Sequence, residues 1–211
     1  MWPRSRRSSL PDYRPVTWDA LAAQLADWLT AKPGPVRVAV DGPPCAEPER
    51  LAASLADPLR ALGRPLVHVP AHGFWRDASL RYEHGREDVD AYLGWLDDGA
   101  LRREVLTGDH YLPSLRDPLS NRVTREPSRP LPDNAVLVVS GAFLLGLGLP
   151  YDAAVHLALS PAARARRTPP DDAWTLPAFD RYDADVSPAA LADVVVRVED
   201  PRRPAVTGLA K

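Results

Sequence analysis

The chain has 211 residues, of which 45% are hydrophobic, and carries a formal net charge of −2. This length and apolar content favour one α/β domain with a proper core, and they argue against global disorder. The near-neutral charge provides no general attraction to nucleic acid or to anionic membranes, so we expect neither as a partner. The chain has one cysteine, which excludes an intrachain disulfide and favours an intracellular setting.

The ends and the residue bias of the chain give further expectations. No apolar run is long enough to cross a bilayer, and the basic segment 1–7 is not followed by a continuous apolar stretch, so we expect a cytoplasmic protein. The chain contains no Ile and only Lys32 and Lys211 as lysines, a bias typical of a GC-rich bacterial genome. We expect residues 1–15 to form a flexible arm and residues 16–211 to form a single domain.

The first half of the chain alternates between helical and strand patterns. Apolar spacing predicts a helix over 18–30 with Thr17 as its N-cap, and the run 36–40 suits a buried parallel strand. A second helix is predicted over 47–62, with Gly63 as its stop and a kink or break at Pro58. A strand over 65–69 follows, then an irregular segment 70–85 and a helical pattern over 86–107 that closes at Gly108.

The second half continues the alternation. A Pro-rich connection spans 113–132 with room for a short strand, and strands are predicted over 135–140, 153–159 and 194–198. Ser160-Pro161 and Ser187-Pro188 each open a short helix, and 171–185 is predicted to be a polar and aromatic connection. Strands that alternate with helices favour a doubly wound, mostly parallel sheet in a three-layer, Rossmann-like α/β fold.

The junction after the first predicted strand has the frame of a phosphate-binding loop. The strand runs into Asp41-Gly42, and a helix begins a few residues later. The pattern G-x-x-x-x-G-K-[ST] would require Gly, Lys and Ser or Thr at positions 47–49, where this chain has Glu47, Pro48 and Glu49. Prolines at three positions of the junction also lack the N–H groups that bind phosphate: Pro43, Pro44 and Pro48. The segment therefore argues against ordinary ATP chemistry.

The order and spacing of several segments point to one known family. They are Val36–Gly42, Phe74 with Arg81-Tyr82, Gly94–Leu106, Ala135–Leu145, Val155–Ser160 and Ala192–Asp200. In this order they resemble the uridine-kinase-like branch of the P-loop nucleoside and small-molecule kinases, over roughly residues 35–200. The resemblance implies a P-loop kinase-like fold with adjoining sites for Mg-ATP and for an acceptor hydroxyl.

The resemblance also assigns roles to particular positions. Asp41, Gly42 and Arg50 would belong to a vestigial nucleotide site. Arg167 would belong to it as a remnant of the family's arginine-bearing lid, for which Arg164, Arg166 and Arg181 are further candidates. The family's acidic pair after the second strand is replaced by His72-Gly73, and the acid that ends its third strand is replaced by Ser140.

His72 is the candidate for surviving general-base catalysis, because imidazole titrates near neutral pH. The alternative is a loop histidine with a local hydrogen bond. We expect a substrate cleft lined by Phe74, Trp75, Arg81 and Tyr82, although these side chains could equally pack a long loop. We expect no metal site, since no recognised ligand spacing is present.

The sequence therefore predicts a catalytically degenerate uridine-kinase-like protein, a pseudokinase with a binding or scaffold role for an unidentified small molecule or protein. Under this hypothesis no cofactor is expected. The alternative is an active ATP-dependent phosphotransferase that acts on a nucleoside or another small hydroxyl compound through an atypical nucleotide site; only then are ATP and Mg²⁺ expected. A third hypothesis is an enzyme that uses His72 and the aromatic cleft without ATP. A homodimer is compatible with each of these hypotheses.

Overall fold

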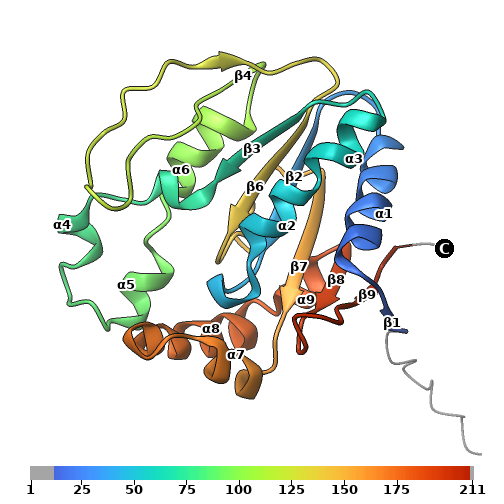
Figure 1. Ribbon diagram of the computed structural model, residues 1–211. Coiled ribbons are helices and arrows are strands. Elements are labelled where there is room, and N and C mark those ends of the chain that lie inside the picture. Colours follow the sequence, from blue (N-terminus) through green and yellow to red (C-terminus); the bar gives the residue numbers. More distant parts are fainter. Residues whose placement is uncertain (1–11, 210–211) are drawn as a thin grey trace, which may run out of the picture.

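A seven-stranded sheet forms the centre of the protein, with helices on both faces (Figure 1). The computed structural model describes residues 12–209, so residues 1–11 of the arm predicted over 1–15 lie outside it. The strand order is β1-β9-β8-β7-β2-β6-β3. Five of these strands run parallel to one another: β2 (Val36–Asp41), β3 (Leu66–Pro70), β6 (Val136–Gly141), β7 (Ala153–Ala158) and β8 (Val194–Arg197). The predicted doubly wound, mostly parallel sheet is confirmed.

One edge of the sheet was not predicted. β9 (Ala205–Thr207) pairs antiparallel with β8, and β1 (Arg14–Pro15) pairs antiparallel with β9. Arg14 and Pro15 were assigned to the flexible arm, and that assignment is wrong for these two residues because they complete the sheet edge. Such short strands carry little sequence pattern of their own, since their pairing depends on a distant partner strand.

The first face of the sheet is covered by α1 (Trp18–Thr30), α2 (Pro48–Ser54) and α3 (Ala56–Ala61) (Figure 1). The Thr17 side chain accepts a hydrogen bond from the N–H of Ala20, which confirms the predicted N-cap. The helix predicted over 47–62 is divided at Leu55, because Pro58 has no N–H to donate to the carbonyl of Ser54.

The second face is covered by α5 (Val89–Leu93), α6 (Asp98–Leu101) and α8 (Leu176–Asp185). The continuous helix predicted over 86–107 is wrong: α5 ends before Gly94, and α6 is followed by the π-helical turn η3 (Arg102–Leu106). Between α5 and α6 the chain pairs with the loop after β3. The N–H of Asp97 donates to the carbonyl of Phe74 over 2.9 Å, and the N–H of Arg76 donates to the carbonyl of Trp95 over 2.8 Å. This tertiary pairing replaces the helical hydrogen bonds.

The segment 171–185 is also helical, contrary to the predicted connection. The 3₁₀ segment η4 (Pro170–Thr175) leads into α8, whose Ala178, Phe179 and Tyr182 are buried against the sheet. These three residues form a narrow apolar stripe on one side of the helix, between charged residues. Because the stripe is narrow, the composition of the segment does not indicate a helix.

The remaining elements are short. They are the 3₁₀ segments η1 (Pro44–Ala46) and η2 (Ala71–Phe74), the helices α4 (Ala78–Arg81), α7 (Pro161–Arg167) and α9 (Pro188–Leu191), and a two-stranded sheet of β4 (His110–Tyr111) and β5 (Arg129–Pro130). Ser160 caps α7 through the N–H of Ala163, as predicted. Within residues 12–209, no helix is long and apolar enough to cross a membrane.

The end of the sheet opposite the junction loop is held by the buried side chain of Arg64. Its guanidinium donates to the carbonyls of Leu29 and Lys32 at the end of α1, over 3.1 and 2.8 Å, and to that of Asn134 before β6, over 2.8 Å. A buried guanidinium with several carbonyl acceptors replaces the water that these groups would otherwise bind. Arg64 therefore joins α1 to the starts of β3 and β6.

We expect Arg64→Ala to lower the free energy of unfolding by about 3 kcal/mol, because it leaves several buried carbonyls without donors. Arg60→Ala is the matched control. Arg60 lies four residues earlier, and its side chain is 77% exposed. Urea denaturation of both variants measures the difference. A loss for Arg64→Ala no larger than that for Arg60→Ala would contradict this role.

Candidate functional site

The junction after β2 runs from strand to loop to helix, and its residues differ from the P-loop motif. Gly42 is required by packing, because a Cβ there would lie 2.9 Å from the Cβ of Leu157. Glu47 adopts the left-handed conformation, with φ of 60°, at the position where the motif has its second glycine. A non-glycine residue is strained in this conformation. Glu47 therefore holds a backbone conformation that glycine adopts more readily.

Most backbone N–H groups of this loop are used within the protein. Gly42 donates to the carbonyl of Gly141, Ala46 donates to that of Pro43, and Glu47 donates to that of Pro44. Two further N–H groups, those of Arg50 and Leu51, donate to the carbonyl of Glu47, and the three prolines have none. Among the described residues, only Cys45 and Glu49 in the span 42–51 have an N–H with no hydrogen-bond acceptor. The loop thus offers far fewer amide donors than a phosphate cradle needs.

Glu49 connects the loop to the predicted catalytic residue. Its Oε1 lies 2.9 Å from Nδ1 of His72, on the loop after β3. This hydrogen bond, together with the charge of His72, holds the pKa of the Glu49 carboxyl below its ordinary value, although partial burial opposes the shift. Glu47 forms a separate exposed ion pair with Arg50, at 3.1 Å. Both acids of the loop are thus engaged by neighbouring side chains.

A cleft of about 410 Å³ lies beside this pair. The loop residues Gly42, Pro44 and Glu47–Arg50 form one wall, and Ala71, His72 and Gly141–Phe143 form another. The rest of the lining is largely aromatic and apolar, from Trp75, Tyr92, Trp95 and Leu96. The rings contact one another edge to face, with 5.2 Å between the centroids of Trp75 and Trp95 and 4.9 Å between those of Tyr92 and Trp95.

An adjoining cavity of about 530 Å³ shares Pro44, Trp75, Tyr92 and Trp95 with the cleft and also contains Arg81. Arg81 is 4% exposed, and its guanidinium lies 4.7 Å from the ring centroid of Trp95 and 5.2 Å from that of Trp75. Its Nε donates to the carbonyl of Arg76 over 2.9 Å. No carboxylate of the described residues forms an ion pair with Arg81. A buried cation stabilised by rings and a carbonyl remains available to an anion.

The structure brings together only some of the predicted site residues. Gly42, Arg50, His72 and Trp75 line the cleft, while Arg81 and Tyr82 line the adjoining cavity. Phe74 was predicted to line the cleft, but its side chain is fully buried in the core beneath the sheet's second face, because it follows β3 on the inward side of η2.

The predicted nucleotide-site residues Asp41 and Arg167 are engaged elsewhere. Asp41 is fully buried, and its Oδ1 accepts the N–H of Leu144 over 2.9 Å while its Oδ2 lies 2.7 Å from Nδ1 of His156. Arg167 donates to the carbonyl of Val198 over 2.6 Å, which joins α7 to the end of β8. Of the further lid candidates, Arg164 is buried between two aspartates.

Sequence reasoning missed several participants. The motif comparison identifies Glu49 as the replacement for a Ser or Thr, but it does not predict the pairing of Glu49 with His72, which joins residues 23 positions apart. Phe143 and Trp174 were not singled out, although both belong to the aromatic group. Within residues 12–209, no group of three or more His, Cys, Asp or Glu side chains is placed to hold a metal ion.

Comparison with solved structures defines the fold class as P-loop kinase-like. A possible uridine kinase from Bacillus stearothermophilus matches with a TM-score of 0.66 and 19% identity, over 83% of this chain and 98% of that one. A candidate fructose transport system kinase from Silicibacter sp. TM1040 matches with a TM-score of 0.53 and 20% identity, over 77% and 95% of the two chains. The YGR205w protein matches with a TM-score of 0.55 and 11% identity, over 91% and 99%.

At these identities the likeness establishes the fold. No protein-family model matches the chain, and no curated protein matches its sequence. The chain therefore has the fold of uridine-kinase-like P-loop kinases, which confirms the predicted resemblance at the level of architecture.

The strained loop leads to a first prediction for this site. We expect Glu47→Gly to raise the free energy of unfolding by about 1 kcal/mol, because glycine adopts a φ of 60° without the clash of a Cβ. Glu47→Ala removes the same charge and the same ion pair with Arg50 but keeps the Cβ, so no gain is expected. Thermal or urea denaturation compares the two. Equal stability of the Gly and Ala variants would show that the loop is unstrained.

His68 leads to a second prediction. Its Nε2 lies 2.8 Å from the Oγ of Ser140 at the end of β6, and burial lowers its pKa from the ordinary value of 6.5. The charge of His72 lowers that pKa further, and the charge of Glu49 raises it. His68 therefore binds a proton more readily in the unfolded chain than in the folded protein. The free energy of unfolding should decrease as the pH falls below about 6.5.

We expect His68→Gln to flatten this part of the stability-versus-pH curve, measured by urea denaturation between neutral and mildly acidic pH. The matched control is His84→Gln, because His84 is exposed. If both variants retain the slope of the unmodified protein, the slope arises from other groups.

Proposed function

We propose that this protein is a catalytically degenerate uridine-kinase-like protein, a pseudokinase that binds a small molecule in the aromatic cleft without transferring phosphate. The observation that carries the proposal is the contact between Glu49 and His72. Glu49 stands at the position where the P-loop motif has its metal-binding Ser or Thr. Its carboxylate is hydrogen-bonded to His72, which belongs to another wall of the cleft. The residue bias and the single cysteine support a cytoplasmic bacterial setting.

The electrostatics of the loop support the absence of Mg-ATP binding. Glu47 and Glu49 would each repel a triphosphate by an amount on the order of 1 kcal/mol or more at a few ångströms. Arg50 offers the loop's one cation, and it is paired with Glu47 and exposed. Asp41, the acid that could assist a metal, is enclosed by protein donors. Charge, amide donors and metal ligand are thus deficient together.

The cleft and its neighbouring cavity also indicate what kind of ligand would suit them. The shared wall of Trp75, Tyr92 and Trp95 favours a planar aromatic group. Arg81 lines the adjoining cavity and forms no ion pair with a carboxylate of the described residues, so an acidic group of the ligand would pair with its guanidinium there. We therefore propose an aromatic ligand with a carboxylate, whose ring lies between the two cavities.

Calorimetric titration with Mg-ATP, with and without uridine, tests the loss of kinase function. We expect no binding tighter than millimolar, and no phosphate transfer to uridine. Micromolar binding of Mg-ATP that is abolished by Arg50→Ala and retained in Arg60→Ala would overturn the proposal in favour of an active phosphotransferase. Arg60 is a matched control because it also forms an exposed ion pair with an acid three residues earlier.

The ligand class is tested with indole-3-acetate and indole, which differ by the carboxylate. We expect both to bind in calorimetric titrations, with at least about tenfold tighter binding of indole-3-acetate. Arg81→Met should abolish that difference while indole binding persists, provided that its melting curve shows a folded protein. Equal affinity for the two probes in the unmodified protein would contradict the role of Arg81.

A further inference from the structure

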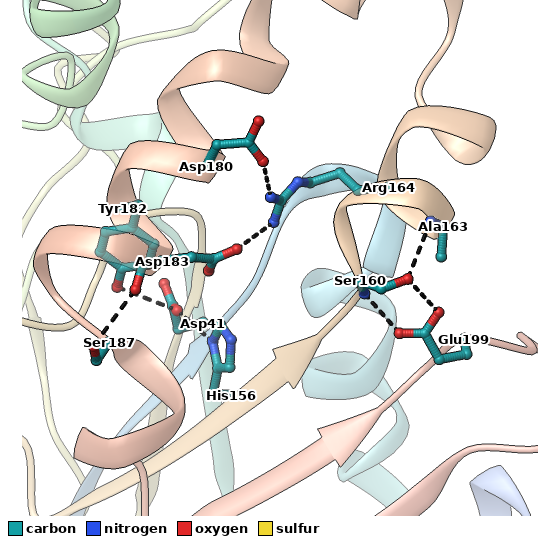
Figure 2. Close-up of polar contacts among 10 residues, drawn as sticks. All are labelled: Asp41, His156, Ser160, Ala163, Arg164, Asp180, Tyr182, Asp183, Ser187 and Glu199. Atoms are coloured by element: carbon teal, nitrogen blue, oxygen red, sulfur yellow. Dashed lines mark hydrogen bonds and ion pairs between the residues drawn. The ribbon is translucent and has the colours of Figure 1, made fainter.

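A third cavity, of about 380 Å³, lies at the carboxyl end of β7. It shares Gly42 and Phe143 with the aromatic cleft, but its other walls come from the end of β7, from α7 and α8, and from the segment that begins α9. Figure 2 shows His156 beside Asp41, together with Tyr182 and the pairing of Arg164 with Asp183. The function proposed for the aromatic cleft does not involve this cavity.

His156 is held in one orientation by Asp41. The two residues are register partners on the adjacent parallel strands β2 and β7, and their side chains meet at 2.7 Å between Oδ2 and Nδ1. An ionised carboxylate only accepts hydrogen bonds, so Nδ1 of His156 carries the proton that it donates to Asp41. The hydroxyl of Tyr182 lies 3.3 Å from the same Oδ2 and accepts the N–H of Leu145 over 3.0 Å. This arrangement fixes the imidazole ring.

Among the described residues, the other ring nitrogen of His156 has no hydrogen-bond partner. The residue is only 5% exposed, yet it lines the cavity, and its Nε2 forms no hydrogen bond with any described residue. Nor is Nε2 among the described side-chain atoms that are both sealed from solvent and unsatisfied. It therefore reaches the cavity space. In the neutral form of the ring that donates from Nδ1, Nε2 is a hydrogen-bond acceptor.

The charges around the cavity disfavour an anion. Arg164 is 2% exposed, and its guanidinium is already paired with Asp183 at 2.8 Å and with Asp180 at 2.5 Å, as Figure 2 shows. Together with Asp41, three carboxylates thus accompany one guanidinium. A hydrogen-bond donor on a ligand would strengthen its binding here, and a negative charge would weaken it.

We propose that this cavity is a second ligand site, which takes a small hydroxyl- or ammonium-bearing molecule without negative charge, such as a polyol or an amino alcohol. A hydroxyl or ammonium group of the ligand donates to Nε2 of His156, and Asp41 keeps the ring in the accepting tautomer. The cavity shares two wall residues with the aromatic cleft, but ligand binding at His156 does not depend on the pseudokinase proposal and can be tested apart from it.

The test follows the ring nitrogens of His156 by NMR in protein labelled with ¹⁵N-histidine, with ethanolamine, glycerol and acetate as probes. We expect a saturable change of the Nε2 shift of His156 with ethanolamine or glycerol at millimolar concentration, and none with acetate. His68 serves as the internal control, because its Nε2 is occupied by Ser140 and it lines none of the three cavities described above. A response to acetate as large as that to ethanolamine, or no saturable response to either donor probe, overturns the proposal.

His156→Asn separates binding from folding. The asparagine amide can donate to Asp41 in place of Nδ1, but it removes the acceptor at the position of Nε2. We expect the variant to remain folded by circular dichroism and to bind the responding probe at least about tenfold more weakly by calorimetry. Unchanged affinity in a folded variant would place the probe elsewhere. If the variant unfolds, the NMR titration of the unmodified protein decides the question alone.

Discussion

The buried carboxylate of Asp41 is the interaction on which the carboxyl edge of the sheet depends. It ends β2 and accepts hydrogen bonds from the backbone after β6, from His156 on β7 and from Tyr182 on α8. A charge without access to water is tolerated only when its hydrogen-bonding capacity is filled, and here each oxygen has a donor. Four segments distant in sequence are thereby fixed around one group.

This arrangement also decides what the edge of the sheet can do. In a phosphoryl-transfer site, the strand ends present charge and amide donors to a nucleotide and its metal. Here the acid after β2 faces inward, most loop amides donate to nearby carbonyls, and Glu49 pairs with His72 across the cleft. These carboxylates and amides are therefore engaged in contacts within the protein. The space that remains is aromatic, with one buried cation at Arg81.

Local pattern was a reliable guide where one element makes its own hydrogen bonds or buries one face. The Thr17 cap, the break around Pro58 and the apolar strand at 136–140 all follow from neighbouring residues. It failed over 86–107, where Leu96 pairs with Trp75, and over 171–185, where only Ala178, Phe179 and Tyr182 form the buried stripe. In both places a distant partner segment outweighs the local preference.

The fold class and the absence of the P-loop residues can be predicted from the sequence, because periodicity and motif spacing are properties of neighbouring positions. Which side chains meet depends on the tertiary structure. The pairing of Glu49 with His72, the enclosure of Asp41 and the free nitrogen of His156 arise from strand register and from loops that fold back over 23 to 141 positions. Such contacts leave no periodic signal, since each depends on the packing of the whole sheet edge.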